Sequence, residues 1–328
     1  MNIQDYFVVP IVDLGQKEAR YAGIYVPEPE LDVQKTGITD QFLENAEVYH
    51  ARYSASDHWL GMFNRIFTSV QKPGGERLRI LDIGTGSGLN TIVPCLKLFP
   101  DCSIVGTDLS PQLLAILRSY VTAESLDDQV YCVCTDAMRN FFKPGSFDVV
   151  VGGSILHHLV DPVAALAAAK RALKPGGIAV FIEPFEGYSV IRAAFTLILA
   201  RAELEGSVSE SAKAFMVAMC RDIEVRAGSD KSSPMFQYMD DKWLFTRTYL
   251  QRASREAGFD SIDVVPMFDP DRQYRRGATG LLAMGGIDAE RDLPAWALDC
   301  FDLFDRSFSS DLKAEATLES GIVLRRSF

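Results

Sequence analysis

A chain of 328 residues, 48% of them hydrophobic and 23% charged, can bury a large interior and has an ordinary globular composition. Its 44 acidic residues outnumber its 33 basic ones, and the formal net charge of −11 argues against a nucleic-acid partner. The longest apolar stretch, residues 188–200, contains Arg192 and is too short to cross a bilayer, so no membrane partner is expected.

The six cysteines are scattered and form no Cys-x-x-Cys pair, which is typical of a reduced, cytoplasmic protein. The first residues lack the basic start of a secretory signal. No histidine or cysteine spacing typical of a metal site is present, so no metal is expected.

The sequence pattern of residues 1–75 predicts an N-terminal arm followed by helices. Apolar runs broken by prolines predict irregular or short-stranded structure over residues 1–37. Helical spacing predicts helices over 39–53 and 57–70, and it places Tyr49 and Tyr53 on one face of the first.

Residues 80–90, Ile-Leu-Asp-Ile-Gly-Thr-Gly-Ser-Gly-Leu-Asn, predict a buried strand, a tight turn and the start of a helix. The alternate glycines Gly84, Gly86 and Gly88 allow a ligand to lie against the backbone, and the helix offers unpaired N–H groups to its polar atoms. Dinucleotide sites instead use Gly-x-Gly-x-x-Gly, so the spacing argues against a nicotinamide cofactor.

Carboxylates follow the next two predicted strands. The strand over 103–107 ends at Asp108, which could accept both hydroxyls of a ribose or merely cap the helix that begins at Pro111. The strand over 130–135 ends at Asp136, where a helix cap is again the alternative to ligand binding.

A fourth strand, 147–154, leads into a loop that holds His157 and His158. An alanine-rich helix over 162–173 then stops at Lys174-Pro175-Gly176-Gly177, because glycine accepts the left-handed conformation of a helix end. A fifth strand, 178–182, ends at Glu183.

In order and spacing, these signals over residues 78–184 resemble the core of the class I S-adenosylmethionine-dependent methyltransferases. The resemblance implies a doubly wound, mostly parallel, seven-stranded α/β sheet with an antiparallel last strand. It also implies S-adenosylmethionine as cofactor, with Asp108 on the ribose, Asp136 on the adenine amino group and the backbone of Ala137 against the ring. The candidate cofactor-binding residues are Asp82, Gly84, Thr85, Gly86, Gly88, Asp108, Leu109, Asp136, Ala137, Met138, Gly152, Tyr49 and Tyr53.

The chain is longer than such a core, so we expect additions around it. The expected parts are an N-terminal arm with helices (1–75), the cofactor-binding core (76–184), a helical lid insertion (185–240), and a C-terminal part of the core (241–328) with a second insertion over about 267–318. Amphipathic segments over 188–205 and 208–227 predict the lid helices, which we expect to close the acceptor pocket and to contribute to a homodimer.

Methyl transfer from a sulfonium needs aligned reactants, exclusion of water and, for an acceptor that carries a proton, a base. His157 and His158 are candidate bases after the fourth strand, because histidine titrates near neutrality, and His50 is a rival. Glu183 could bind a substrate hydroxyl or act as a base. For each of these residues, a structural role in a loop or helix is the open alternative.

Four residues are candidates for substrate binding. Arg272 and Arg275 belong to a basic cluster that could bind a carboxylate or phosphate, or could lie in a solvated loop. Tyr188 and Arg192, at the start of the expected lid, are the others.

The expected function is methyl transfer to a small molecule, with a sugar or secondary-metabolite hydroxyl as the first candidate for the acceptor. Two alternatives stay open. One is an S-adenosylmethionine-binding protein without methyl transfer, either a partner module or a non-methylating catalyst. The other is a nicotinamide-dependent oxidoreductase.

Overall fold

The computed structural model describes residues 2–32, 39, 41–53, 56–70, 77–139, 141–205 and 208–327, without the side chains of 53 and 56. Its described strands form one nine-stranded sheet in the order β1-β2-β5-β4-β3-β6-β7-β9-β8. The strands are β1 (Ile11–Asp13), β2 (Ile24–Pro27), β3 (Arg79–Ile83), β4 (Ser103–Asp108), β5 (Val130–Cys134), β6 (Phe147–Gly153), β7 (Leu173–Pro184), β8 (Ser261–Pro266) and β9 (Glu319–Arg325).

The sheet contains the expected seven strands and two more. Strands β2, β5, β4, β3, β6 and β7 run parallel, whereas β9 is antiparallel to both β7 and β8. The antiparallel last strand therefore lies where the sequence predicts it. The expected count of seven was too low, because the N-terminal arm adds β1 and β2 beside β5, with Ile24 opposite Cys132.

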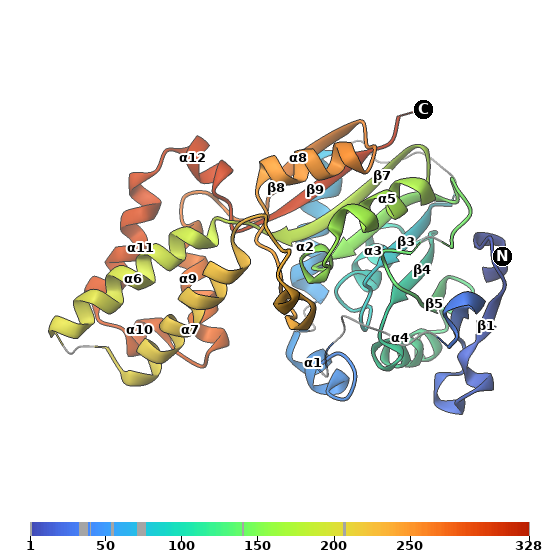
Figure 1. Ribbon diagram of the computed structural model, residues 1–328, viewed down its shortest axis with the longest axis horizontal. Helices are drawn as coiled ribbons and strands as arrows, with labels where there is room; N and C mark the ends of the chain where they lie inside the picture. Colours follow the sequence, from blue (N-terminus) through green and yellow to red (C-terminus); the bar gives the residue numbers. More distant parts are fainter. Residues whose placement is uncertain are drawn as a thin grey trace.

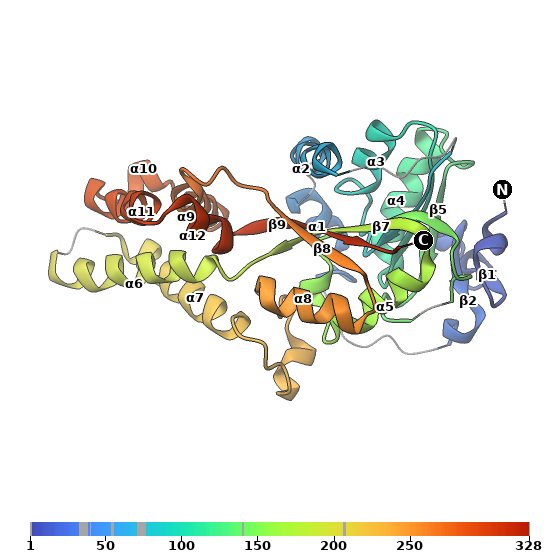
Figure 2. The ribbon, with the colours of Figure 1, turned by 90° about the horizontal axis from the view of Figure 1, so that it is seen from above.

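Helices cover both faces of the sheet. They are α1 (Ala46–Tyr53), α2 (Ser56–Ser69), α3 (Ile92–Leu98), α4 (Pro111–Ala123), α5 (Pro162–Ala172) and α8 (Arg247–Glu256). Side chains alternate along β3, so that Leu81 packs in one core with α5 and α8, while Ile80 packs in the other with α2, α3 and α4. This two-faced arrangement, seen in Figure 1 and from above in Figure 2, is the expected doubly wound α/β fold.

The two insertions form one helical lobe beside the sheet domain (Figures 1 and 2). It contains α6 (Tyr188–Glu205), α7 (Glu210–Arg226), α9 (Gln273–Met284), α10 (Ala289–Asp292), α11 (Ala295–Ser307) and α12 (Ser310–Glu315). Residues such as Phe195 of α6 and Phe301 of α11 share a buried apolar core of their own. The first insertion therefore cannot be removed without exposing the core that it shares with the second.

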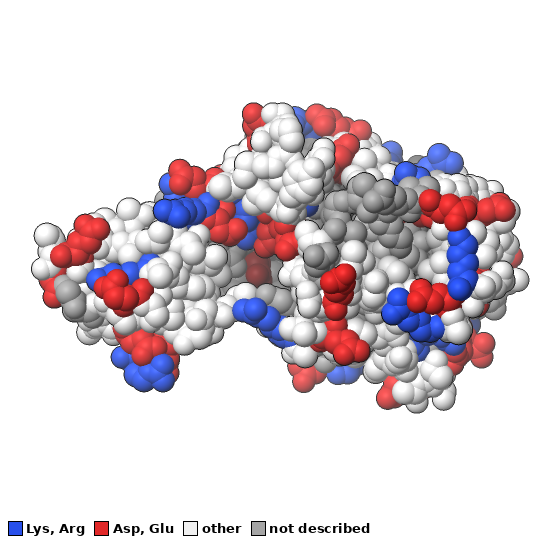
Figure 3. Space-filling view, turned by 60° about the horizontal axis from the view of Figure 1, so that its bottom comes forward, with Lys and Arg blue, Asp and Glu red and all other residues white. Residues whose placement is uncertain are grey.

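The lobe and the sheet domain also touch through side chains. Arg52 of α1 donates a 3.3 Å hydrogen bond to the carbonyl of Met284, at the end of α9. Figure 3 shows a hollow between the two bodies, with charged side chains of both signs along it. Among the described residues, no helix is long and apolar enough to cross a membrane.

Candidate active site

A pocket that is partly open to solvent lies where β3, β4, β5 and β6 end, at the carboxyl edge of the parallel strands. This is the edge at which open α/β sheets bind ligands. The sequence-predicted residues that line it are Tyr49, His50, Gly84, Thr85, Gly86, Asp108, Leu109, Asp136, Ala137, Met138 and His158.

The three glycines of the turn after β3 have different functions, although all have positive φ. A Cβ atom at Gly84 would lie 2.4 Å from Ile155, and one at Gly88 would lie 2.4 Å from Leu117. A Cβ at Gly86 would meet nothing closer than Leu113, at 4.0 Å. Gly84 and Gly88 therefore allow close packing within the protein, whereas Gly86 leaves its space to the pocket.

Asp108, at the end of β4, holds the glycine turn and the next helix together. One carboxylate oxygen accepts a 2.8 Å hydrogen bond from the Gly86 N–H, and the other accepts one of 2.8 Å from the Ser110 N–H. The helix cap is made by the Ser110 hydroxyl, which accepts from Leu113 N–H. Ser110 is therefore the N-cap residue of α4, and Asp108 helps to order the start of this helix while it also lines the pocket. Its predicted role toward a ribose stays a prediction.

Asp136 follows β5, and the N-terminal arm supports this loop. Asp136 accepts from the Met138 N–H at 2.9 Å, while Glu30 of the arm accepts from the Thr135 hydroxyl at 2.5 Å. Glu30 is buried, and burial raises the pKa of its carboxyl. Sequence reasoning missed Glu30, because nothing in the arm indicates that it reaches β5.

Three of the predicted cofactor-binding residues lie behind the pocket lining. Asp82 is fully buried, accepts a hydrogen bond from the Thr91 hydroxyl, and has its pKa raised to about 7 by burial. Gly88 and Gly152 serve packing, because a Cβ at Gly152 would lie 2.7 Å from Phe181. The predicted role of Tyr53 rests on a side chain outside the described residues.

Glu183, at the end of β7, orders the loop after β6. It accepts hydrogen bonds from the backbone N–H groups of Ile155, Leu156 and His157, and its Oε2 lies 2.6 Å from His157 Nδ1. Both side chains are buried, and neither lines the pocket. Their geometry matches the structural interpretation that the sequence left open, and a direct catalytic role for either stays a prediction.

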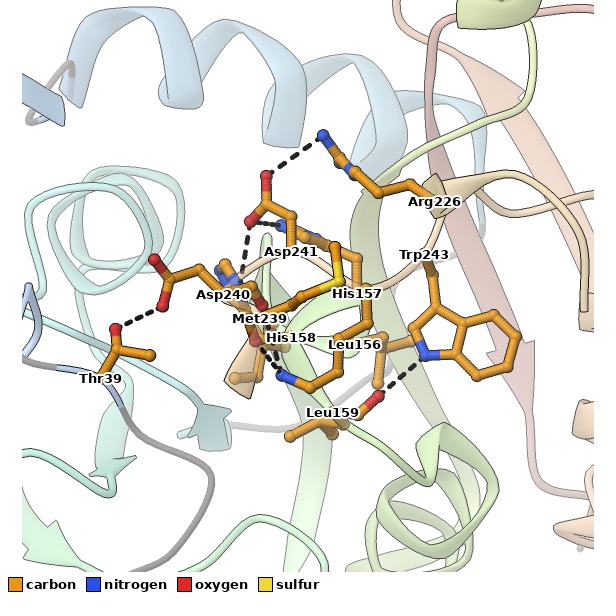
Figure 4. Close-up of polar contacts among 12 residues, drawn as sticks. Thr39, Leu156, His157, His158, Leu159, Arg226, Met239, Asp240, Asp241 and Trp243 are labelled. Carbon is orange, nitrogen blue, oxygen red and sulfur yellow. Dashed lines mark hydrogen bonds and ion pairs between the residues drawn. The ribbon is translucent and has the colours of Figure 1, made fainter. Parts of the chain in front are cut away.

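His157 and His158 share a third partner, Asp241, which the sequence gave no reason to select (Figure 4). Asp241 Oδ1 lies 3.4 Å from His157 Nε2 and 3.3 Å from His158 Nδ1, and its Oδ2 lies 3.2 Å from Arg226 of α7. Burial would lower the pKa of His157, but Glu183 and Asp241 outweigh it and raise that pKa to about 9. The pKa of Asp241 is lowered, because His157 and Arg226 outweigh its burial.

His158 differs from His157, because burial and the neighbouring His157 charge lower its pKa to about 3. Its Nδ1 lies 3.0 Å from the Asp240 carbonyl, which can only accept, so Nδ1 carries the proton. Nε2 is then the unprotonated nitrogen of a neutral imidazole. His158 is therefore neutral and lines the pocket, with Nε2 able to accept a proton, although its lowered pKa makes it a weaker base than an ordinary histidine.

The pocket also contains Phe42 and Lys242, which the sequence analysis did not select, and His50, which it did. Phe42, before α1, packs edge-on against both Tyr49 and His158, with ring centroids 4.9 and 5.5 Å apart. Lys242, in the segment that returns from the lobe, lines the pocket and donates to the Met239 carbonyl. His50 Nδ1 lies 2.8 Å from the Ser87 hydroxyl, next to the glycine turn.

The predicted substrate-binding residues lie in the lobe and do not line this pocket. Arg192 pairs with Glu224 at 3.0 Å. Arg275 is held by Glu290 and Asp302, and it belongs to α9 rather than to a loop. Their roles toward a substrate stay predictions, as do lid closure and the homodimer.

From the shifted pKa values of the paired histidines, we expect the free energy of unfolding to be greatest near pH 6.5. His157 has a raised pKa, so its contribution is complete below pH 6.5 and is lost as pH rises toward 9. His158 has a lowered pKa, so its contribution is complete above pH 6.5 and is lost as pH falls toward 3. At about 1.4 kcal/mol per pKa unit, the effect is on the order of 3 kcal/mol for His157 and on the order of 5 kcal/mol for His158.

Urea unfolding across this pH range measures the effect. The free energy of unfolding should fall on both sides of the maximum, and His158→Gln should flatten the curve just below pH 6.5 while leaving the alkaline side in place. If the free energy of unfolding of His158→Gln fell as steeply below pH 6.5 as that of the wild type, the pKa of His158 would not be lowered.

Comparison with known proteins agrees with this geometry. A family model described as "Methyltransferase domain" matches residues 81–181. A demethylmenaquinone methyltransferase of Lactiplantibacillus plantarum is 32% identical over 126 residues, which are 38% of this chain and 51% of that protein. A ubiquinone biosynthesis O-methyltransferase of Idiomarina loihiensis is 31% identical over 99 residues, which are 30% of this chain and 39% of that protein. The chain thus spans about half or less of the length of these relatives.

Among solved structures, phosphoethanolamine N-methyltransferase 2 of Haemonchus contortus, in complex with S-adenosyl-L-methionine, has a similar fold. Its TM-score is 0.52 at 20% sequence identity, over 91% of this chain and 61% of that chain.

The fold and the pocket therefore define a nucleotide-binding α/β domain of the methyltransferase type. Residues 81–181 belong to the class I S-adenosylmethionine-dependent methyltransferase family, whose cofactor is S-adenosylmethionine. The described residues fit this cofactor in two respects. Gly86 leaves space beside its backbone, and Asp108 and Asp136 line the same pocket.

Proposed function

We propose that this protein transfers the methyl group of S-adenosylmethionine to a hydroxyl of a small molecule. The observation that carries the proposal is that one pocket joins the glycine turn, two carboxylates and a neutral histidine. In this assignment Asp108 binds the ribose hydroxyls, Asp136 binds the adenine amino group, and the Ala137 backbone meets the ring. The cofactor supplies the electrophilic methyl group, and the protein residues position it and manage the acceptor's proton.

His158 is the proposed base. Its unprotonated Nε2 can accept the proton of an acceptor hydroxyl as the oxygen–methyl bond forms, while Nδ1–H stays on the Asp240 carbonyl. Asp241 would then stabilise the imidazolium, because its carboxylate lies 3.3 Å from the ring. His50 is the second candidate, since it lines the same pocket beside Ser87.

The proposal of a small-molecule acceptor is supported by the names of the relatives, of which one is an O-methyltransferase of ubiquinone biosynthesis. The acidic net charge gives no support to a nucleic-acid acceptor. Sugar and secondary-metabolite hydroxyls are therefore the first acceptors to assay, together with phenolic hydroxyls.

A transfer assay with methyl-labelled S-adenosylmethionine and a panel of hydroxyl, amine and carbon acceptors tests the proposal. We expect label only on hydroxyl acceptors. We expect His158→Gln to lower kcat by about 100-fold or more, the range for loss of a general base, without changing cofactor affinity. His58→Gln, on the exposed face of α2, is the matched control.

Two outcomes would contradict the proposal. Label on amines alone would show that the acceptor is a nitrogen. Tight S-adenosylhomocysteine binding without transfer to any acceptor would favour the non-methylating alternative.

A further inference from the structure

Asp241 brings three metal-ligand atoms together beside the pocket. Its Oδ1 lies 3.4 Å from His157 Nε2 and 3.3 Å from His158 Nδ1, and all three atoms lie within 4.8 Å of one another. Figure 4 shows both rings turned toward this carboxylate. The histidines follow β6, whereas Asp241 lies on the segment that returns from the lobe, so only the folded chain forms this group.

The spacing of these atoms matches metal coordination better than direct hydrogen bonding. A good N–H···O hydrogen bond joins atoms about 2.9 Å apart. Tetrahedral zinc, with bonds of about 2.0–2.1 Å to nitrogen and oxygen, places its ligand atoms about 3.3–3.4 Å from one another. Both observed distances fall in that interval. The Asp240 carbonyl, 3.0 Å from His158 Nδ1, offers a fourth oxygen.

A second layer of contacts orients these ligands. Glu183 accepts the Nδ1–H of His157 at 2.6 Å, which leaves Nε2 as the nitrogen that faces Asp241. A carboxylate behind a ligating histidine is the arrangement found at many protein zinc sites. Arg226 holds the other oxygen of Asp241 at 3.2 Å.

We propose that His157 Nε2, His158 Nδ1 and Asp241 Oδ1 bind a divalent transition-metal ion, zinc or cobalt rather than magnesium. Two imidazoles and one carboxylate suit a borderline ion that accepts nitrogen ligands, whereas magnesium demands oxygen ligands. The sequence gave no expectation of a metal, because Asp241 is far from the histidines along the chain.

Proton balance follows from the hydrogen bonds. Without metal, His158 carries its proton on Nδ1, which donates to the Asp240 carbonyl. Metal binding moves this proton from Nδ1 to Nε2. Because a histidine binds metal only through an unprotonated nitrogen, affinity should rise with pH.

Metal binding and base catalysis by His158 exclude each other. With metal on Nδ1, the proton sits on Nε2, so the ring can donate to an acceptor but cannot accept its proton. The metal-loaded protein should bind the cofactor yet transfer methyl groups poorly. This consequence rests on the proposed function, whereas the binding site does not.

Cobalt(II) titration of the full chain, stripped with EDTA, tests the site without turnover. We expect one equivalent to bind, with the intense visible absorption of tetrahedral cobalt. Asp241→Asn and His158→Gln should each weaken binding by at least about tenfold, because each removes one of three ligands. His58→Gln should bind like the wild type, since His58 is exposed on α2.

Circular dichroism and S-adenosylhomocysteine titration of the same samples show whether each variant is folded. Asp241 is partly exposed, so its replacement by asparagine is the safer of the two changes. Absence of cobalt binding to the stripped wild type, or equal binding by the wild type and both folded variants, would overturn the proposal. Neither result would bear on methyl transfer, which is measured separately.

Discussion

Gly86→Val is expected to abolish binding of S-adenosylhomocysteine while leaving the protein folded. Gly86 has φ +54°, and the nearest atom to an added Cβ is Leu113 Cδ1 at 4.0 Å. A valine side chain would therefore occupy pocket space rather than collide with the protein. The left-handed backbone adds a strain of about 1–2 kcal/mol, which a stable domain tolerates. Calorimetric titration with S-adenosylhomocysteine measures the loss.

Two further glycine substitutions separate binding from folding. Gly84→Ala should lower the melting temperature, because its Cβ would lie 2.4 Å from Ile155. Gly280→Ala, on the exposed face of α9, should leave binding unchanged and raise the melting temperature slightly, since nothing lies within 4 Å of its Cβ and alanine favours a helix interior. A folded Gly86→Val protein that binds normally would mean that the cofactor lies elsewhere.

Asp108→Ala is expected to weaken S-adenosylmethionine binding by roughly 2–3 kcal/mol, the range for charge-assisted hydrogen bonds to two ribose hydroxyls. This corresponds to roughly a 30- to 150-fold loss of affinity. The variant also loses the two bonds that join the carboxylate to the Gly86 and Ser110 N–H groups, so some turn order is lost as well.

Asp108→Asn is the matched variant, because its amide keeps one acceptor oxygen and the same shape. We expect it to lose less affinity than Asp108→Ala. Its melting temperature should lie slightly below that of the wild type, because the amide NH2 cannot accept from the Gly86 or the Ser110 N–H. Calorimetry that finds equal affinity in the wild type and both variants would remove Asp108 from the cofactor site.

The central sheet could be predicted from the sequence because its signals are local. Each parallel strand is a short apolar run, and each is followed by a turn or cap within a few residues, as at Gly84 to Gly88 and at Ser110-Pro111. The short strand β2 was missed as part of the sheet, since its pairing with β5 depends on contacts across much of the chain.

The side of the pocket that contains Asp108 and Asp136 was predictable for the same reason, because each residue lies at or just after the end of its strand. The other side depends on distant contacts. Asp241 and Lys242 follow α6 and α7 in the chain, and no sequence motif indicates that they lie at the site. Glu183 and His157 were selected by position, but the hydrogen bond that occupies both could be seen only in the folded chain.

In the helical lobe, the sequence predicted two helices but not the helices that they pack against. The spacing over 188–205 and 208–227 predicted α6 and α7 closely. It could not indicate that their apolar faces pack against α9 and α11, because an apolar stripe carries no information about which partner it meets.

Titration of the purified wild-type chain with S-adenosylhomocysteine, and in parallel with NAD, tests the central assignment most directly. We predict saturable binding of one S-adenosylhomocysteine per chain, lost in Gly86→Val, and no saturable binding of NAD. Binding of NAD without S-adenosylhomocysteine, or of neither, would contradict the assignment of this pocket to S-adenosylmethionine.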